Sequence, residues 1–174
     1  MNPSPTPVLG FSAASGTGKT TLMAAVIAHL HQVGLRVAAI KHGHHPADPD
    51  MPGKDTFRFR QAGAATVLFA SRERWFLIQE LRDQAEPTLA EQVNYLPGHD
   101  LILVEGYKNE AHPKIVVHRL ASGSASLHDQ LHHVIAVVTD DPQLKTTLPR
   151  FALDDTAAIA QFICDYFGLR TQSI

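Results

Sequence analysis

The amino-acid sequence predicts an α/β fold with a mainly parallel sheet, and three observations support this prediction. Short apolar runs alternate with segments of helical periodicity along the chain. Most of these runs are continuous, as in strands buried on both faces. A glycine-rich turn joins the first run to the first helical segment. With 174 residues, 44% of them hydrophobic, the chain suits one domain over residues 1–174, with residues 1–7 as a flexible lead-in.

The elements follow from apolar patterns and from the residues at their ends. The expected strands are residues 8–11, 36–40, 66–70, 75–78, 101–104, 115–118 and 134–138, and the expected helices are 19–33, 55–62, 88–94 and 156–167. Asp155 is expected to cap the last helix, which ends before Gly168. The third and fourth strands are too close in sequence for a helical crossover, so they should form an antiparallel hairpin. Its edge is available to a second subunit.

Composition limits the classes of partner and the compartment. The net charge is -2, so the sequence has no basic face typical of nucleic-acid binding and no polybasic run typical of membrane binding. The only cysteine, Cys164, excludes an intramolecular disulfide and paired-cysteine zinc motifs. We expect it to be a buried thiol in a cytoplasmic protein.

The segment from Ala13 to Thr21 has the residue types and spacing of a phosphate-binding (Walker A) loop. Its two glycines let the backbone turn N–H groups onto phosphate oxygens, and its lysine brings a charge to the β and γ phosphates. The threonine after the lysine offers a hydroxyl to Mg²⁺. The expected nucleotide-binding residues are Ser15, Gly16, Thr17, Gly18, Lys19, Thr20 and Thr21. The motif therefore predicts a P-loop NTPase-like three-layer sandwich that holds a nucleoside triphosphate.

Ala13 occupies the place usually taken by the first glycine of this loop. Alanine costs little there if the residue keeps a negative φ, because only a left-handed turn would require glycine.

Glu105 is the acidic residue best placed to serve the phosphate site. It directly follows the apolar run at residues 101–104. Ligands bind beyond the carboxyl ends of strands in open α/β sheets, so Glu105 should emerge beside the phosphate loop. It could hold Mg²⁺ with Thr20, directly or through water, or it could position water for attack. Lys19 and Glu105 are the predicted catalytic residues.

The polar segment of residues 41–55 follows the second expected strand and should lie over the nucleotide. Its lysines and histidines are candidate anion contacts, and Asp55 either caps the next helix or helps to hold Mg²⁺. The candidate contacts are Lys41, His42, His44, His45 and Lys54. Two other interpretations stay open. The histidines with Asp48 and Asp50 could form a transition-metal cluster, although their spacing matches no closed zinc site, or the loop could simply be solvated.

Several segments in order along the chain resemble the molybdopterin-guanine dinucleotide biosynthesis protein B (MobB) family. They are residues 11–21, 40–45, 52–55, 62–64, 101–108 and 134–137. The family it resembles also lacks the first glycine of the loop, which accounts for Ala13.

The resemblance implies a GTP-binding, weakly hydrolysing homodimer that assists the guanylyltransferase attaching GMP to molybdopterin. In this family the protein is an adapter more than the catalyst of that transfer, with GTP and Mg²⁺ as its ligands. Lys108, in the last part of the 101–108 segment, joins the candidate anion or pterin contacts. The guanine-reading Asn-Lys-x-Asp motif is absent, and we expect Asp140 to accept hydrogen bonds from the guanine edge instead, although the alternative of a simple Asp-Pro turn stays open.

The residues around the loop predict slow hydrolysis. Position 14 is alanine where some dimeric relatives carry a second lysine, so that charge is missing from the transition state. The remaining candidates to supply positive charge to the transition state are Lys54, Arg58 and Arg60. Two alternative functions stay open: a small nucleotide or metabolite kinase, whose lid would draw on Arg58, Arg60, Arg72 and Arg74, and a metal-insertion GTPase that uses the histidine loop.

Overall fold

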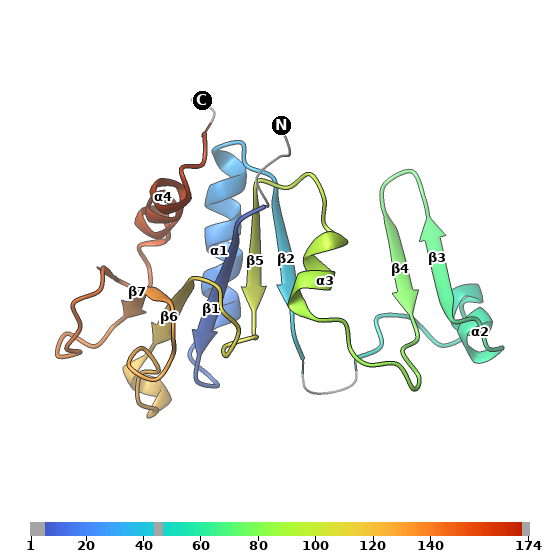
Figure 1. The fold of residues 1–174 in the computed structure, drawn as a ribbon, viewed down its shortest axis with the longest axis horizontal. Coiled ribbons are helices and arrows are strands. Elements are labelled where there is room, and N and C mark those ends of the chain that lie inside the picture. The colour runs from blue at the N-terminus through green and yellow to red at the C-terminus, as the bar shows by residue number, and fades with distance from the viewer. Residues whose placement is uncertain (1–5, 44–46, 172–174) are drawn as a thin grey trace. The chain divides into compact units, whose positions relative to one another are not determined.

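The computed structural model describes residues 6–43 and 47–171, which form a parallel sheet of six strands and a separate antiparallel pair (Figure 1). This confirms the predicted α/β class, a mainly parallel sheet with helices around it and an antiparallel hairpin. His44 and His45 lie outside the described residues. No helix in the described ranges is long and apolar enough to cross a membrane.

Apart from one short strand and one 3₁₀ turn, the observed strands and helices are the predicted ones, with ends that differ by at most two residues. The strands are β1 (Val8–Ala13), β2 (Val37–Lys41), β3 (Thr66–Ala70), β4 (Trp75–Gln79), β5 (Leu101–Glu105), β6 (Lys114–His118), β7 (Val134–Thr139) and β8 (Arg150–Phe151). The helices are α1 (Lys19–Gln32), α2 (Asp55–Gln61), α3 (Leu89–Asn94), α4 (Thr156–Phe167) and the 3₁₀ turn η1 (Leu120–Ser122). The sequence did not predict β8, because two residues are too few to show a strand pattern.

The six-stranded sheet has the order β2-β5-β1-β6-β7-β8, and every neighbouring pair is parallel. β1 therefore lies between β5 and β6. Its last residues pair with Glu105 on one side and with Val117 on the other. Because the strands are parallel, the loops after β1, β2, β5, β6 and β7 emerge at the same edge of the sheet.

The hydrophobic core lies between one face of this sheet and the helices α1 and α4, which also pack against each other. Alternate strand residues point into it, as the two-residue period of a strand requires. These core residues are Leu9, Phe11, Leu101, Leu103, Ile115, Val117, Ala136 and Val138. The residues between them, among them Ile102 and Val116, are buried as well, so the strands are covered on both faces. Cys164 on α4 is buried in the core, as predicted.

The ends of α1 and α4 follow the expected capping chemistry. The Asp155 carboxylate accepts the N–H of Ala158 at 3.2 Å, which confirms it as the N-cap of α4. Gly168 has a φ of 62° at the other end of that helix. After α1, Gly34 donates its N–H to the carbonyl oxygen of His31 at 2.9 Å. Its φ of 85° lies in the left-handed region, which is typical of a glycine that follows a helix.

The chain divides into two compact units, and each is described by itself. The first comprises Met1–His42 and Glu91–Ile174 and contains the six-stranded sheet. The second, Gly43–Ala90, contains α2 and the β3–β4 hairpin. The hairpin pairs Ala70 with Trp75 across its tight turn, as predicted. That residues 1–174 form a single domain stays a prediction.

Candidate functional site

The turn between β1 and α1 has the backbone of an anion-binding loop. Gly16 and Gly18 have φ values of 77° and 79°, where residues with a side chain are strained. Ala13 is the last residue of β1 and is not among the residues with positive φ. The two retained glycines are thus at the positions that need them, and alanine is at a position that does not.

The N-terminus of α1 presents free backbone donors to this loop. Gly18 is the N-cap and has no side chain to accept the first N–H groups, and the first turn contains no acidic residue. These N–H groups and the helix dipole together favour an anion. Thr17 is buried, and its hydroxyl donates to the carbonyl oxygen of Ala14 at 3.1 Å, which holds the loop in shape.

Glu105 meets the lysine and threonine of the loop, because β5 pairs with β1 and ends beside it. Its Oε1 atom lies 2.5 Å from Nζ of Lys19. The Thr20 hydroxyl lies 3.0 Å from Oε2 and 3.2 Å from Oε1. Lys41, at the end of β2, places its Nζ 3.8 Å from Oε1. Two residues of the phosphate loop and one lysine from the segment after it in sequence, Lys41, therefore surround one carboxylate.

The Glu105 carboxylate is ionised in this setting. Burial alone would raise its pKa, but the hydrogen bond and charge of Lys19, with smaller contributions from Thr20 and Lys41, lower the pKa below its usual value. Its side chain is only 13% exposed, so these contacts are weakly screened by water. The site therefore keeps a negative oxygen ligand near the loop at neutral pH.

The oxygen atoms of Thr20 and Glu105 fit Mg²⁺ by chemistry and by spacing. Mg²⁺ prefers oxygen ligands at about 2.0–2.1 Å in octahedral geometry, which puts adjacent ligand atoms about 3 Å apart. The Thr20 hydroxyl and Oε2 of Glu105 are 3.0 Å apart. These two side chains could therefore occupy neighbouring positions on one ion.

The backbones after β2 and β5 touch, and this contact aligns the segment beyond Glu105. His42 donates its N–H to the Glu105 carbonyl oxygen at 2.9 Å. Gly106 has a φ of 106°, and a β-carbon there would lie only 2.8 Å from Cβ of His42. The His42 ring stacks on Tyr107 with a centroid distance of 4.3 Å and an interplanar angle of 27°. Lys108 follows and is exposed.

Asp140 directly follows β7, and one of its two carboxylate oxygens already accepts a hydrogen bond. Oδ1 accepts the N–H of Leu120 at 2.7 Å, which joins the loops that follow β6 and β7. The residue is exposed at the carboxyl edge of the sheet. The contact of Asp140 with guanine stays a prediction. It would use Oδ2, because Oδ1 already accepts the Leu120 N–H.

The second unit contains the remaining predicted site residues. Asp55 is the first residue of α2, and the N-cap is Lys54, so Asp55 does not cap the helix. Both residues are exposed. An acidic residue in the first turn still interacts favourably with the helix dipole. The proposed contact of Asp55 with Mg²⁺ and that of Lys54 with an anion stay predictions.

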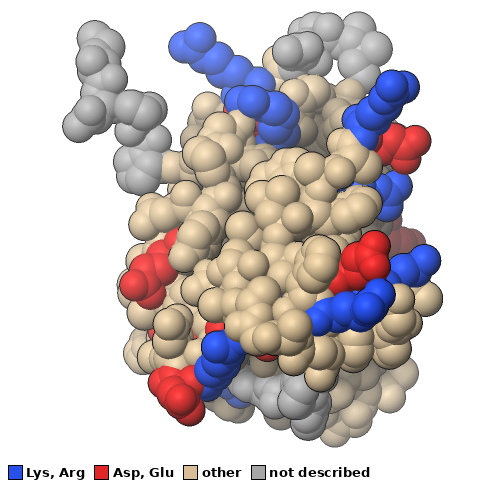
Figure 2. All heavy atoms as spheres, turned by 90° about the vertical axis from the view of Figure 1, so that its right-hand side faces the viewer, with Lys and Arg blue, Asp and Glu red and all other residues tan. Residues whose placement is uncertain are grey.

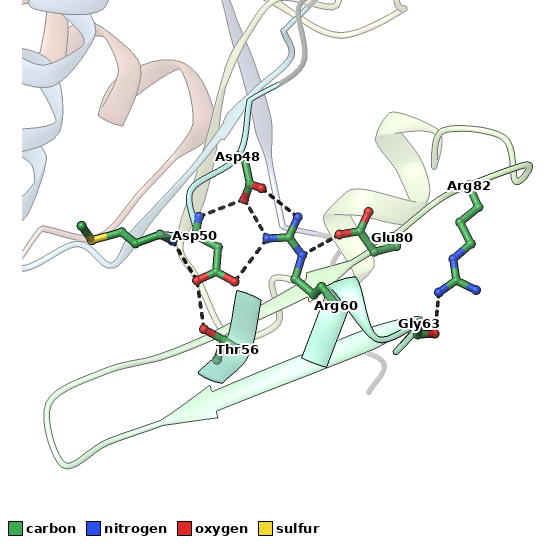
Figure 3. Close-up of polar contacts among 8 residues, drawn as sticks. Asp48, Asp50, Thr56, Arg60, Gly63, Glu80 and Arg82 are labelled. Atoms are coloured by element: carbon green, nitrogen blue, oxygen red, sulfur yellow. Dashed lines mark hydrogen bonds and ion pairs between the residues drawn. The ribbon is translucent and has the colours of Figure 1, made fainter. Parts of the chain in front are cut away.

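Arg60 on α2 is held by three carboxylates of its own unit (Figure 3). It contacts Asp48 at 2.8 Å, Asp50 at 3.2 Å and Glu80 at 2.5 Å. The hydrogen bond from Arg60 lowers the pKa of Asp48, and its carboxylate partners raise the pKa of Arg60 further above its usual value. Thr56 also donates to Asp50, at 2.9 Å. Arg60 thus ties α2 to the segment before it and to the hairpin.

This network changes the interpretation of two predicted groups. Asp48 and Asp50, which the metal-cluster interpretation used, instead bind a guanidinium. Among the described residues no group of three or more His, Cys, Asp or Glu side chains is placed to hold a metal ion. Arg58 is exposed, and its Nη1 lies 4.0 Å from Oδ1 of Asp55.

Arg119 is a residue at the loop that the sequence analysis missed. It directly follows β6, the neighbour of β1 on the side away from Glu105. A β-carbon built on Gly18 would lie 3.4 Å from Nη2 of Arg119. The rule that pointed to Glu105, a polar residue after a buried strand, applies equally to Arg119 and could have found it.

Comparison with known proteins agrees with this geometry. Residues 8–140 match the family described as Molybdopterin guanine dinucleotide synthesis protein B. The chain is 41% identical over 165 residues to the molybdopterin-guanine dinucleotide biosynthesis adapter protein of Escherichia coli K12, covering 92% of this chain and 93% of that protein. It is 39% identical over 137 residues to the Haemophilus influenzae protein of the same name, covering 78% and 76% of the two chains.

Solved structures show the same fold. A crystal structure of molybdopterin-guanine biosynthesis protein B superposes with a TM-score of 0.72 at 25% identity, covering 91% of this chain and 99% of the other. A homologue from Bacillus stearothermophilus superposes with a TM-score of 0.68 at 26% identity, covering 94% and 99%.

Proposed function

The chain belongs to the molybdopterin guanine dinucleotide synthesis protein B family, and from this premise we propose that it is a GTP-binding adapter of molybdenum cofactor biosynthesis. In this proposal it assists the conversion of molybdopterin to molybdopterin guanine dinucleotide and is at most a weak GTPase. The observation that carries the nucleotide part is the meeting of Lys19, Thr20 and Glu105 at the loop before α1.

Each of these three residues has a separate role in the proposal. The Lys19 ammonium, now 2.5 Å from Glu105, turns to the β and γ phosphates when they enter the loop. Thr20 and Glu105 hold Mg²⁺, directly or through water, and the ion neutralises phosphate charge. The N-terminal N–H groups of α1 and the loop backbone bind the remaining phosphate oxygens.

Slow hydrolysis is supported by what the structure shows of the candidate groups for the transition state. Fast transfer to water needs extra positive charge and a positioned water molecule. Position 14 offers only a methyl group, and Arg60 is occupied by three carboxylates. In the nucleotide-bound state of this proposal, Glu105 holds Mg²⁺ together with Thr20 and is therefore a poor base for water. We infer that the bound nucleotide acts chiefly as a structural ligand.

The segments after β2 and β5 are proposed to contact molybdopterin or another anion. The side chain of Lys41 is 68% exposed, and Lys108 is exposed as well. The stacked rings of His42 and Tyr107 lie in the same segments and offer a flat face to a pterin ring. His44, His45 and Lys54 complete the proposed set.

We further propose that the chain forms a homodimer through the β3–β4 hairpin. Five large apolar side chains on the two strands are exposed, from 39% for Phe76 to 67% for Trp75. They are Leu68, Phe69, Trp75, Phe76 and Leu77. Residues other than Lys, Arg, Asp and Glu make up most of the surface drawn in Figure 2. An isolated pair of strands is marginally stable, and exposed apolar patches mark interfaces, so a second copy would both stabilise and cover it.

Sedimentation of paired variants tests the dimer. Trp75→Lys places a charge in the centre of the hairpin's apolar surface and should shift the protein toward monomer. Arg72→Lys, in the turn of the same hairpin, keeps its charge and should leave the mass unchanged. A wild-type monomer at tens of micromolar, or a dimer that is indifferent to Trp75→Lys, would contradict the proposal.

The adapter function is tested by dinucleotide formation in a mixture of this protein, molybdopterin, GTP, Mg²⁺ and the guanylyltransferase. The wild-type protein should increase the yield, and Lys19→Ala should remove the increase. Lys145→Ala, which deletes the same charge from an exposed loop, is the matched control. Equal yields with wild-type protein and Lys19→Ala would count against a nucleotide-dependent adapter. A kinase assay with ATP and metal analysis of the purified protein test the kinase and metal-insertion alternatives.

A further inference from the structure

Arg119 is held in place at the carboxyl end of β6. Its backbone continues the strand, with φ of -133° and ψ of 125°. Its carbonyl oxygen accepts the Ser122 N–H at 3.0 Å and the Ser122 hydroxyl at 2.7 Å. The next residue, Leu120, donates its N–H to Asp140 at 2.7 Å. The start of the side chain is therefore fixed on both sides.

The guanidinium reaches back across the phosphate loop. Nη2 and Cζ lie 3.4 Å and 3.8 Å from the position that a β-carbon on Gly18 would take. Gly18 immediately precedes Lys19 and caps α1. The group thus brings a further positive charge beside the loop, one that the Walker A motif does not include.

The guanidinium also has a donor without an acceptor in the described part of the chain. Its Nε–H is buried and has no hydrogen-bond partner in residues 6–43 and 47–171, and no carboxylate of those ranges forms an ion pair with it. A buried donor without an acceptor is unfavourable, especially on a charged group. Its five N–H donors are well suited to phosphate and other anionic oxygens.

Arg119 lies on the opposite flank of the loop from Glu105. The sheet order puts β5, with Glu105, on one side of β1 and β6, with Arg119, on the other. Glu105, Thr20 and Lys41 gather on the β5 side, where Mg²⁺ and the terminal phosphate are expected. A group on the β6 side should therefore contact the part of the nucleotide that a diphosphate and a triphosphate share.

We propose that Arg119 is a nucleotide-binding residue that donates hydrogen bonds from the β6 side to oxygens common to GDP and GTP. The inference rests on the proposed function, because it requires that the loop bind a guanine nucleotide. It assigns Arg119 to ground-state binding and not to acceleration of hydrolysis.

Calorimetric titration of Arg119→Ala, Arg119→Lys and wild-type protein with GDP and with GTP, at saturating Mg²⁺, tests this assignment. Arg119→Ala should weaken both nucleotides by roughly tenfold or more, as expected for loss of charge-assisted hydrogen bonds. The affinities of Arg119→Lys should lie between those of the wild type and of Arg119→Ala, because lysine keeps the charge and loses the planar donor set. Arg36→Ala is the matched control, since Arg36 precedes β2 at the far edge of the sheet and its side chain is 71% exposed.

Each result supports or overturns the assignment. Equal loss for GDP and GTP, with Arg36→Ala unchanged, supports it. Unchanged affinities in Arg119→Ala overturn it, and so does a loss confined to GTP, which would place the group at the γ-phosphate. If Arg119→Ala has a lowered melting temperature, the comparison moves to Arg119→Lys, where undiminished affinity for both nucleotides overturns the assignment. Wild-type protein that binds neither nucleotide would overturn the proposed function itself.

Discussion

Gly106 is the position where a single added methyl group should disturb the site most. Its φ of 106° lies in a region that residues with a side chain rarely adopt. A β-carbon there would lie 2.8 Å from Cβ of His42 and 3.3 Å from its carbonyl oxygen. His42 is itself bonded through its N–H to the Glu105 carbonyl oxygen. Gly106→Ala should therefore separate the ends of β2 and β5 and move Lys41 and Glu105 apart.

The expected loss of stability has two parts. Backbone strain at this φ costs about 1–3 kcal/mol. The close contact with His42 costs about 1–3 kcal/mol more, by analogy with overpacked sites. The free energy of unfolding should thus fall by about 2–6 kcal/mol. Gly123→Ala is a matched control, because Gly123 has a φ of 65° and nothing within 4 Å of its β-carbon position. It should lose only about 1–2 kcal/mol.

Urea unfolding of the two variants and the wild type measures these differences directly. Thermal unfolding should agree, with a shift of roughly 2–4 °C for each kcal/mol in a chain of this size. Titration of GTP at several Mg²⁺ concentrations is the functional readout, and only Gly106→Ala should need more Mg²⁺ for half-maximal binding.

The reasoning would be refuted by a Gly106→Ala variant no less stable than Gly123→Ala. It would also fail if Gly106→Ala were much less stable and yet bound GTP and Mg²⁺ as the wild type does. In that case the contact of Gly106 with His42 would matter for folding but not for the position of Glu105.

Three further predictions concern metal binding, base selection and pH. Glu105→Gln should raise the Mg²⁺ concentration needed for GTP binding by roughly 10- to 100-fold, measured by calorimetry. Asp140→Asn keeps an oxygen for the Leu120 N–H but loses the negative charge, so the preference for GTP over ATP should disappear in competition binding while the melting temperature holds. Burial, together with the nearby charge of Lys114, lowers the pKa of His112 to about 4. The unfolded chain therefore binds more protons between pH 6.5 and 4, and about 3 kcal/mol of stability present above pH 6.5 should be lost as the pH falls through that range. His112→Leu should remove this dependence in urea unfolding.

Controls and contrary outcomes separate these effects from general damage. Glu73→Gln, in the exposed hairpin turn, should leave the Mg²⁺ requirement unchanged, and an equal effect would remove the case for Glu105. An Asp140→Asn protein that still prefers GTP would show that another group reads guanine. His31→Leu, on the exposed side of α1, should keep the pH dependence, and a slope that persists in His112→Leu would exclude His112 as its source.

The sequence was informative wherever the deciding interactions are local. Apolar periodicity located the longer strands of the six-stranded sheet and the helices α1 and α4 because each buries one face or both faces, and that requirement is visible within a few residues. The loop at Gly16 and Gly18 could be predicted for the same reason, since positive φ, a following lysine and a helix start are properties of adjacent residues. Asp155 was found by its position before a helical pattern. β8 was not predicted because two residues are too few to show the alternation of a strand.

What the sequence determined by itself is therefore the longer strands and the α-helices, the phosphate loop and the presence of a carboxylate at the end of β5. Only the tertiary structure decided which strands are neighbours of β1, because strand order depends on long-range pairing that leaves no local pattern. That order brought Lys41 to Glu105 and Arg119 to Gly18. It also showed that Arg60, a candidate from sequence, is bound by carboxylates of its own unit. The sequence predicts which groups can bind a phosphate, and the fold decides which of them meet it.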